Sequence, residues 1–313
     1  MELVRGLHNI AQRHTGCVLT VGNYDGVHLG HQQMIGVLKS RAAEFNAAAT
    51  VLVFEPSSKE FIDPESAPPR LTRWREKFLA LAAQGVDRLV TLRFDEGMRA
   101  MTPQRFVDEL IVSGLGARHV VVGDDFRFGC NADGTIESLR AAGQQRGFGV
   151  EQLPPFVMDG VRVSSTAVRN RLECGDYDAA TRLLGRRYRM MGRVVHGNEL
   201  GRKLGFPTAN LRLMRCKSPV HGILAVRVYG IEAHVPLAAV ASLGTRPTVG
   251  GSELLLEVHV FDFSGDLYGR LIEVEFIAKL RDEVKFDSLD ALTEQMNIDA
   301  AQARGLLSKV KSG

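Results

Sequence analysis

Short apolar runs alternate with amphipathic stretches along the first half of the chain. Five runs of four or five residues have the length and the β-branched content of buried strands. They cover residues 17–21, 50–54, 88–92, 119–122 and 150–153. Between them, apolar residues recur at helical spacing over residues 32–45, 72–83, 103–112 and 136–146. This alternation predicts an α/β domain, in which helices cover a mostly parallel sheet.

From residue 188 onward the pattern changes to short β-like runs separated by turn residues, which predict an antiparallel barrel or sandwich. The runs cover residues 188–195, 222–229, 235–241, 254–263 and 271–277. A short helical segment stops at Gly185, so we place the domain boundary there, with domains over residues 1–185 and 186–313. The tail from Ser288 has apolar residues at helical spacing and predicts a helix packed on the second domain.

Composition narrows the class of protein. The 313 residues are 45% hydrophobic and 24% charged, as in an ordinary globular protein, and the net charge of +3 gives no argument for nucleic-acid binding. We expect neither secretion nor membrane insertion, because the start lacks an apolar signal region and no run approaches a membrane span. The four scattered cysteines suit a reducing cytoplasm. The sequence leaves open whether the chain forms a homo-oligomer.

The stretch GNYDGVHLGH, residues 22–31, joins a predicted strand to a predicted helix. His28 and His31 therefore lie at a helix N-terminus, where backbone N–H groups and the helix dipole favour anions. Gly30 between them lets a phosphate oxygen approach the backbone. Two imidazoles here can neutralise charge on a transferring phosphoryl group. A lone histidine near a turn is usually structural, but the whole string favours phosphate chemistry.

Two further loops are expected at the same sheet edge, where parallel sheets bind ligands. In VVVGDDFRFG, residues 120–129, Phe126 and Phe128 either stack a planar ring or pin the loop. In RVSSTAVRNR, residues 162–171, hydroxyls and Arg169 at a helix start suggest a second anion site. The alternative for any single residue there is plain helix capping.

In the second domain, Glu257 and His259 share one strand face, opposite Leu256 and Val258. The pattern leaves Glu257 as either a salt-bridge partner at the rim or a catalytic base. In GRKLGFPTAN, residues 201–210, Thr208 and Asn210 offer two oxygens at alternate positions, which suits Mg²⁺ on a nucleotide phosphate. This stretch is not a P-loop, because the GxxxxGK[ST] order is absent.

The chain resembles the prokaryotic bifunctional riboflavin kinase/FMN adenylyltransferase (FAD synthetase) family over essentially its whole length. The matching stretches are GNYDGVHLGH, VVGDDFRFG, VSSTAVRNRL, and GRKLGFPTANL followed by LEVHVFDFSGDLYG and KLRDEVKFDSLDAL. The resemblance implies a Rossmann-like nucleotidyltransferase of the HxGH type, followed by a six-stranded antiparallel riboflavin-kinase barrel. It implies phosphorylation of riboflavin to FMN and adenylylation of FMN to FAD, with ATP as co-substrate and Mg²⁺ as cofactor.

The resemblance also implies residue roles. His28 and His31 would stabilise the ATP phosphates, and Glu257 would deprotonate the riboflavin 5′-hydroxyl. Thr208 and Asn210 would hold Mg·ATP in the kinase. Other ATP and phosphate contacts of the transferase would be Gly22, Asn23, Asp25, Gly30, Asp125, Arg162, Ser165, Thr166 and Arg169. Nucleotide and flavin contacts of the kinase would be Gly201, Lys203, Gly205, Phe206, Pro207, Arg281 and Phe286.

The sequence departs from the family pattern at a few positions. Tyr24 stands where the family usually has Phe, and Ser57 and Ser58 lie where a second proline of the FxPxP loop is usual. Ala132 replaces a basic residue, and Ser242 replaces the more common Asn. None of these changes removes a residue assigned to chemistry.

Three other functions remain as alternatives. One of the two activities could be absent, the chain could be a flavin or nucleotide sensor without turnover, or it could adenylylate another phosphate ester. A sensor needs none of His28, His31 and Glu257, so their joint presence argues against it. The GFPTAN segment argues against a different phosphate ester.

Overall fold

The structure is a computed structural model that describes residues 1–197, 201, 204–233, 235–248 and 251–309. Its internal contacts divide the chain into two compact units. The first contains residues 1–68 and 74–164, and the second contains residues 69–73 and 165–313. The expected boundary at residue 185 concerns which segments fold independently, and it stays a prediction.

The first unit is built on a six-stranded parallel sheet with the strand order β1-β4-β3-β2-β5-β6. The strands are β1 (Glu2–Arg5), β2 (Val18–Val21), β3 (Ala49–Phe54), β4 (Arg88–Leu92), β5 (His119–Gly123) and β6 (Gly149–Leu153). The short antiparallel pair β7 (Val157–Met158) and β8 (Val161–Arg162) follows them.

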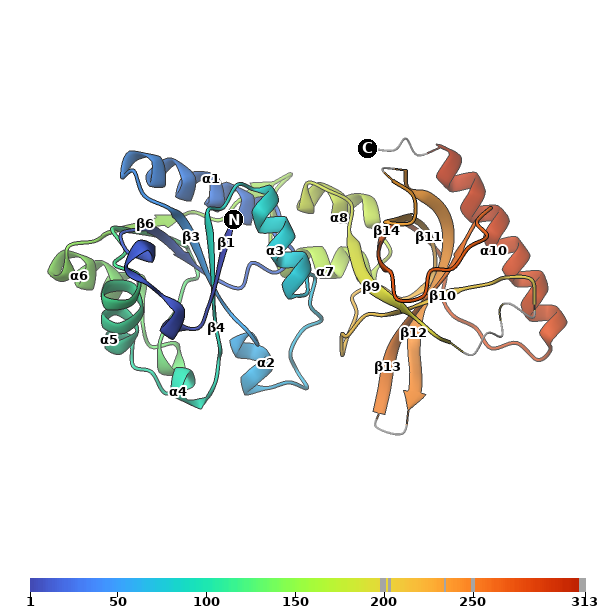
Figure 1. Cartoon of the computed structure of the whole chain (residues 1–313), viewed down its shortest axis with the longest axis horizontal. Coiled ribbons are helices and arrows are strands. Elements are labelled where there is room, and N and C mark those ends of the chain that lie inside the picture. Colours follow the sequence, from blue (N-terminus) through green and yellow to red (C-terminus); the bar gives the residue numbers. More distant parts are fainter. Residues whose placement is uncertain (198–200, 202–203, 234, 249–250, 310–313) are drawn as a thin grey trace. The chain divides into compact units, whose positions relative to one another are not determined.

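Helices cover both faces of this sheet (Figure 1). One face packs on α1 (Leu29–Glu44) and α3 (Trp74–Ala83), and the other on η3 (Phe106–Gly114) and α6 (Ile136–Arg146). Side chains alternate between the two cores along each strand, so Val18 faces α1 while Leu19 faces η3. The remaining short helices are η1 (Leu7–Asn9), η2 (Gln12–His14), α2 (Ser58–Ile62), α4 (Glu96–Arg99), α5 (Pro103–Arg105) and η4 (Cys130–Ala132).

The second unit is a closed antiparallel barrel of six strands in the order β10-β13-β12-β11-β14-β9. The strands are β9 (Arg189–Val195), β10 (Ala209–Arg212), β11 (Gly222–Tyr229), β12 (Leu237–Thr248), β13 (Gly251–Val260) and β14 (Leu271–Arg281). The helices α7 (Ser165–Glu173) and α8 (Tyr177–Leu184) precede the barrel. The long helix α10 (Leu289–Lys309) lies along its outside (Figure 1), where Ala303 and Leu307 pack on Ala225 and Ile277.

The predicted fold class is confirmed, a parallel α/β sheet followed by a six-stranded barrel with a C-terminal helix. The apolar pattern missed β1 and β10, because each has only four residues and no continuous apolar run. The single helix expected over residues 103–112 is instead one turn of α-helix, α5, followed by the π-helical segment η3. Helix α8 ends at Gly185 (φ 71°) as expected, and Asp176 is its N-cap.

Candidate functional sites

The turn from β2 to α1 is sharply bent. Tyr24 and Val27 have φ values of 48° and 43°, and Gly26 between them has φ 84°. Tyr24 is almost fully buried, and its hydroxyl lies 2.6 Å from Thr20 Oγ1 and 3.0 Å from Met34 Sδ. The hydroxyl that distinguishes this chain from the usual Phe is therefore hydrogen-bonded inside the protein. These contacts fix the turn that presents the two histidines.

His28 and His31 are brought together at the start of α1. Their rings are stacked, with centroids 3.7 Å apart and planes 19° apart. His28 is the N-cap residue, and its Nδ1 accepts a hydrogen bond of 3.4 Å from the His31 backbone N–H. Because Nδ1 is the acceptor, this bond assigns the His28 proton to Nε2, which can donate to a ligand. His31 Nδ1 is buried, and the described residues offer it no hydrogen-bond partner.

The His31 ring is held in its neutral form. Desolvation lowers its pKa well below the ordinary value, and its electrostatic interactions with His28 and with Lys77 lower the pKa further. Lys77 is a buried residue of α3, and sequence reasoning missed it. A lysine on a buried helix face, four residues before buried Leu81, was the signal that could have revealed it.

Gly30 lies in the tightest part of the turn. A Cβ at this position would be 3.3 Å from His28 Nδ1 and 3.3 Å from the Val163 carbonyl oxygen. A larger residue would therefore press on the imidazole. The glycine keeps the first-turn N–H groups of α1 approachable for an anion.

Two other predicted residues of the first unit, Asp125 and Arg162, also lie together. The Arg162 guanidinium is 2.7 Å from Asp124 Oδ1 and 3.4 Å from Asp125 Oδ2. Phe128 is buried and packs on Phe106, with ring centroids 5.2 Å apart, so it pins the loop. Phe126 stacks on Phe128. Gly22, Asn23 and Asp25 lie in the β2–α1 turn itself, where Asn23 is exposed.

Ser165, Thr166 and Arg169 lie on α7, in the second unit. Ser165 is the first residue of that helix, so hydroxyl groups do mark a helix start here. The Arg169 Nε–H donates a 2.6 Å hydrogen bond to the Pro69 carbonyl oxygen.

On the barrel, Glu257 is the centre of a row of polar residues on three neighbouring strands. Glu257 of β13 pairs directly with Asn210 of β10 on one side and with Ser242 of β12 on the other. Directly paired residues point to the same face of a sheet. Glu257 is half-buried, and the flanking Leu256 and Val258 are buried on the opposite, inner face.

Oxygen ligands suited to Mg²⁺ lie beside this carboxylate. Asn210 is buried, and its amide nitrogen lies 3.5 Å from the Thr208 carbonyl oxygen. The amide nitrogen is therefore the end of the side chain that the backbone holds. A Cβ at Gly197 would collide with the Asn210 amide, so only glycine at this position leaves room for that amide. Within the described ranges, no three His, Cys, Asp or Glu side chains gather as a metal site. Thr208 and Asn210 suit a hard cation that also binds nucleotide oxygens.

The GFPTAN loop is fastened to the same face. His259 follows Glu257 by two residues, and its Nδ1 atom is 2.9 Å from the Pro207 carbonyl oxygen. The His259 ring packs edge-on against the ring of Phe206. The backbone N–H of Phe206 donates to the Gly201 carbonyl oxygen (2.8 Å), and Gly205 has φ 84°. Lys203 lies outside the described residues. Sequence reasoning placed His259 on this face but did not foresee that it anchors the loop.

The segment after β14 carries Arg281 and Phe286. The Arg281 guanidinium donates through two of its nitrogens to the buried Asp299 carboxylate of α10, with N–O distances of 2.7 to 3.1 Å. The guanidinium carbon lies 5.7 Å from the centre of the Phe286 ring. Glu283, which sequence reasoning missed, accepts a 2.9 Å hydrogen bond from Ser242. The segment is thus tied both to α10 and to the strand beside Glu257.

Comparisons with known proteins show the family of this chain. The family model described as FAD synthetase matches residues 10–167, and the one described as riboflavin kinase matches residues 184–307. A bifunctional riboflavin kinase/FMN adenylyltransferase of Pseudomonas fluorescens is 48% identical over 307 residues, covering 98% of both chains. The protein of the same description from Escherichia coli K12 is 46% identical over 99% of both. The chain belongs to the bifunctional riboflavin kinase/FMN adenylyltransferase family.

Among solved structures, a protein of Streptococcus pneumoniae described as a macrolide-efflux protein superposes with a TM-score of 0.82. It is 31% identical, and the match covers 97% of this chain and 99% of that one. Among the helices that the structure describes, none has the length and apolar character that a membrane crossing requires.

In this family setting, the His28–His31 turn falls within the FAD synthetase match, and Glu257, Asn210 and Thr208 fall within the riboflavin kinase match. The helix α8 lies mostly between the two matched regions.

Proposed function

We propose that this chain phosphorylates riboflavin to FMN in its barrel and adenylylates FMN to FAD in its α/β unit, using ATP in both reactions. The observation that carries the proposal is the presence of two separate constellations, each inside the matching family region. One is the stacked pair His28 and His31 at a helix N-terminus. The other is the row formed by Asn210, Glu257 and Ser242.

In adenylyl transfer, a phosphate oxygen of FMN attacks the α-phosphorus of ATP, and the bond to the bridging oxygen breaks to release pyrophosphate. The nucleophile is already an anion, so the site needs donors that offset the crowding of negative charge. The His28 Nε2–H, the N–H groups at the start of α1 and Arg162 supply them. We assign Ser165, Thr166 and Arg169 to a second phosphate-binding edge on the strength of the family resemblance.

In the kinase reaction, the riboflavin 5′-hydroxyl oxygen attacks the γ-phosphorus of ATP, and the bond to ADP breaks. A neutral hydroxyl is a poor nucleophile, so Glu257 accepts its proton as the new bond forms. Thr208 and Asn210 would hold Mg²⁺, which supplies positive charge to the ATP phosphates when bound. Gly201, Lys203, Gly205, Phe206 and Pro207 would shape the nucleotide loop, and Arg281 and Phe286 would belong to the segment covering the flavin.

The test is to incubate the purified protein with riboflavin and Mg·ATP and to follow the flavins by chromatography. We expect riboflavin to be converted first to FMN and then to FAD, with pyrophosphate released in the second step. Accumulation of FMN without FAD would mean that only the kinase works. Binding of flavin without any product would favour a sensor. We expect these reactions to take place in the cytoplasm.

A further inference from the structure

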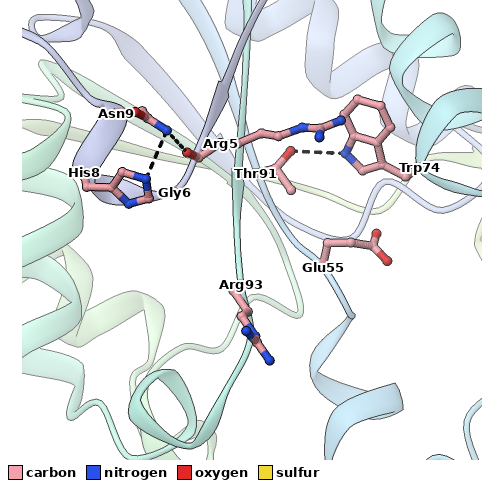
Figure 2. A pocket seen from close by; sticks show the side chains of 8 residues that line it. All are labelled: Arg5, Gly6, His8, Asn9, Glu55, Trp74, Thr91 and Arg93. Carbon is pink, nitrogen blue, oxygen red and sulfur yellow. Dashed lines mark hydrogen bonds between the residues drawn. The ribbon is translucent and has the colours of Figure 1, made fainter.

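A cavity of about 590 Å³ in the first unit lies at the sheet edge where parallel α/β sheets bind ligands. It is lined by Arg5, Gly6, His8, Asn9, Glu55, Trp74, Thr91 and Arg93 (Figure 2). Glu55 directly follows β3 and Arg93 directly follows β4, so the cavity opens beyond the carboxyl ends of these strands. We therefore count it with the proposed adenylyltransferase site. Glu283, on the barrel, has contacts that neither proposed reaction explains.

Glu283 belongs to a strap, residues 281–286, that begins at the last residue of β14. The first residue of the strap, Arg281, donates to the buried Asp299 carboxylate of α10. The last, Phe286, has its ring centre 5.7 Å from the Arg281 guanidinium carbon. Residues 282–285 between them are exposed. In this exposed stretch, Glu283 carries the tie to β12, because its carboxylate accepts a 2.9 Å hydrogen bond from the Ser242 hydroxyl.

The Glu283 carboxylate lies in a notch on the outer face of β12. Gly244 follows Ser242 by two residues, so the two positions share one face of the strand. A Cβ at Gly244 would collide with the Glu283 carboxylate. Any side chain at residue 244 would therefore expel the carboxylate from its place beside Ser242.

A second glycine makes room for the backbone of the strap. Gly222 of β11 pairs directly with Leu243, the residue between Ser242 and Gly244. A Cβ at Gly222 would collide with the Arg281 carbonyl oxygen. The barrel surface is thus cut away on two neighbouring strands where the strap begins.

The tie lies beside the proposed base of the kinase. Ser242 of β12 pairs directly with Glu257 of β13, so their side chains point to the same face. The hydrogen bond to Glu283 therefore fixes the strap to the strand that neighbours Glu257. Phe286, which the family resemblance assigns to the flavin, follows Glu283 by three residues.

We propose that Glu283 is a positioning residue of the kinase: bonded to Ser242 and seated against Gly244, it holds the strap in place before riboflavin binds. This inference rests on the proposed kinase function. A segment that is ordered beforehand loses less conformational entropy when its ligand binds. Breaking the tie should therefore weaken riboflavin binding, and phosphoryl transfer at saturating riboflavin should keep its rate.

Initial rates of FMN formation by the full-length protein test this expectation. Glu283→Ala and Ser242→Ala should each raise the KM for riboflavin by about tenfold, the effect of losing one hydrogen bond to a charged group, with kcat unchanged. The double variant should match the single ones, because both substitutions remove the same bond. Ser242→Thr keeps the hydroxyl and should retain the wild-type KM. Partial unfolding would instead lower kcat and leave KM unchanged.

Gly244→Ala is the sharpest variant, because it keeps both bonding partners and separates them sterically. It should raise the KM as Glu283→Ala does, and should speed amide hydrogen exchange in residues 282–286. The matched control is Gly305→Ala on α10, where an added Cβ meets no atom within 4 Å. Wild-type KM in Gly244→Ala, a lower KM, or a loss confined to kcat would each overturn the role of Glu283. Absence of FMN formation by the wild-type protein would contradict the proposed function itself.

Discussion

The two candidate active sites present opposite kinds of side chain. In the α/β unit, two stacked imidazoles lie at a helix N-terminus, and burial holds the His31 ring in its neutral form. On the barrel, a half-buried carboxylate lies between a buried amide and a hydroxyl. This difference matches the different nucleophiles of the two proposed reactions. FMN already carries a negative phosphate and needs its charge offset, whereas riboflavin offers a neutral hydroxyl and needs a base.

The sharpest test of this contrast is Glu257→Gln, which keeps the shape of the side chain and removes its basicity. We expect FMN formation to fall by roughly 10²–10⁴, with riboflavin binding largely kept and FAD formation from FMN unchanged. Single-turnover kinetics with each flavin separate the two reactions. Glu232→Gln, at an exposed carboxylate on the barrel, is the matched control and should retain full activity. A Gln variant with normal turnover at saturating riboflavin but weak flavin binding would make Glu257 a structural partner instead.

The converse experiment removes the donors of the other site. Each of His28→Ala and His31→Ala should lower FAD formation by about 10²–10³, the usual effect of losing one such donor, and FMN formation should not change. His119→Ala, on β5 and outside the turn, serves as the control histidine. If the double variant His28→Ala/His31→Ala still formed FAD near the wild-type rate, the assignment of the turn would be wrong.

The sequence predicted the frame of both sites because their elements carry strong patterns. The buried run Val18–Val21 and the helical spacing after Gly30 place the two histidines at a strand–helix junction, and the structure confirms that placement. The alternation around Glu257 likewise predicted its outward face correctly. Local periodicity suffices where a side chain's position depends on its own strand or helix.

Residues that depend on contacts distant in sequence were not predictable in this way. Lys77 affects His31 across a gap of more than forty residues, and the contact of Ser242 with Glu283 needs the placement of the segment after β14. The pairing of Asn210 with Glu257 needs the register of β10 on β13, and β10 is too short to show a pattern. The binding of Arg281 by Asp299 needs the position of α10 on β14. Each of these contacts is a property of the topology.

The contrast between the two units can also be tested by separating them. A fragment of residues 187–313 should fold and phosphorylate riboflavin, since it holds the barrel and the residues assigned to the kinase. It lacks α8, whose buried Tyr177 stacks on Phe276 of β14 with centroids 6.5 Å apart. Burial of one such side chain contributes roughly 1.5–3 kcal/mol, so a fragment of residues 165–313 should unfold at clearly higher denaturant concentration.

Urea unfolding of both fragments, with kinase assays alongside, checks this prediction. Both fragments lack residues 69–73, whose Leu71 carbonyl accepts from the Tyr188 hydroxyl (2.9 Å), so the difference between them isolates α7 and α8. Equal stability would show that the barrel needs neither helix and would support the boundary at residue 185. A folded but inactive longer fragment would mean that the first unit completes the kinase site.

A smaller effect is expected from the protonation of His31. Its pKa in the folded protein lies well below the ordinary 6.5 of the unfolded chain, chiefly through desolvation. The unfolded state therefore binds the proton first, so the free energy of unfolding falls as the pH drops below about 6.5. Above that pH neither state binds the proton, so His31 no longer makes the free energy of unfolding depend on pH. The NMR signals of the His31 ring are identified as those that the variant His31→Asn lacks. In the wild-type protein these signals should not shift between pH 8 and 6. A titration near pH 6.5 would contradict a neutral buried ring.

The smallest predicted effect concerns the residue where this chain departs from its family in the turn. Tyr24→Phe removes the hydroxyl that lies 2.6 Å from Thr20 Oγ1, and leaves the ring beside His31, with centroids 4.9 Å apart. Thr20 keeps a contact with Met34 Sδ at 3.3 Å, so the loss should be that of one ordinary hydrogen bond, about 0.5–1.5 kcal/mol in the free energy of unfolding. FAD formation should stay within a factor of about two, because the charge-offsetting donors of the turn are untouched. Chemical denaturation and adenylyl-transfer assays of the one variant measure both quantities. A large drop in FAD formation with little change in stability would show that the Tyr24 hydroxyl acts on the histidine pair and does more than fill the core.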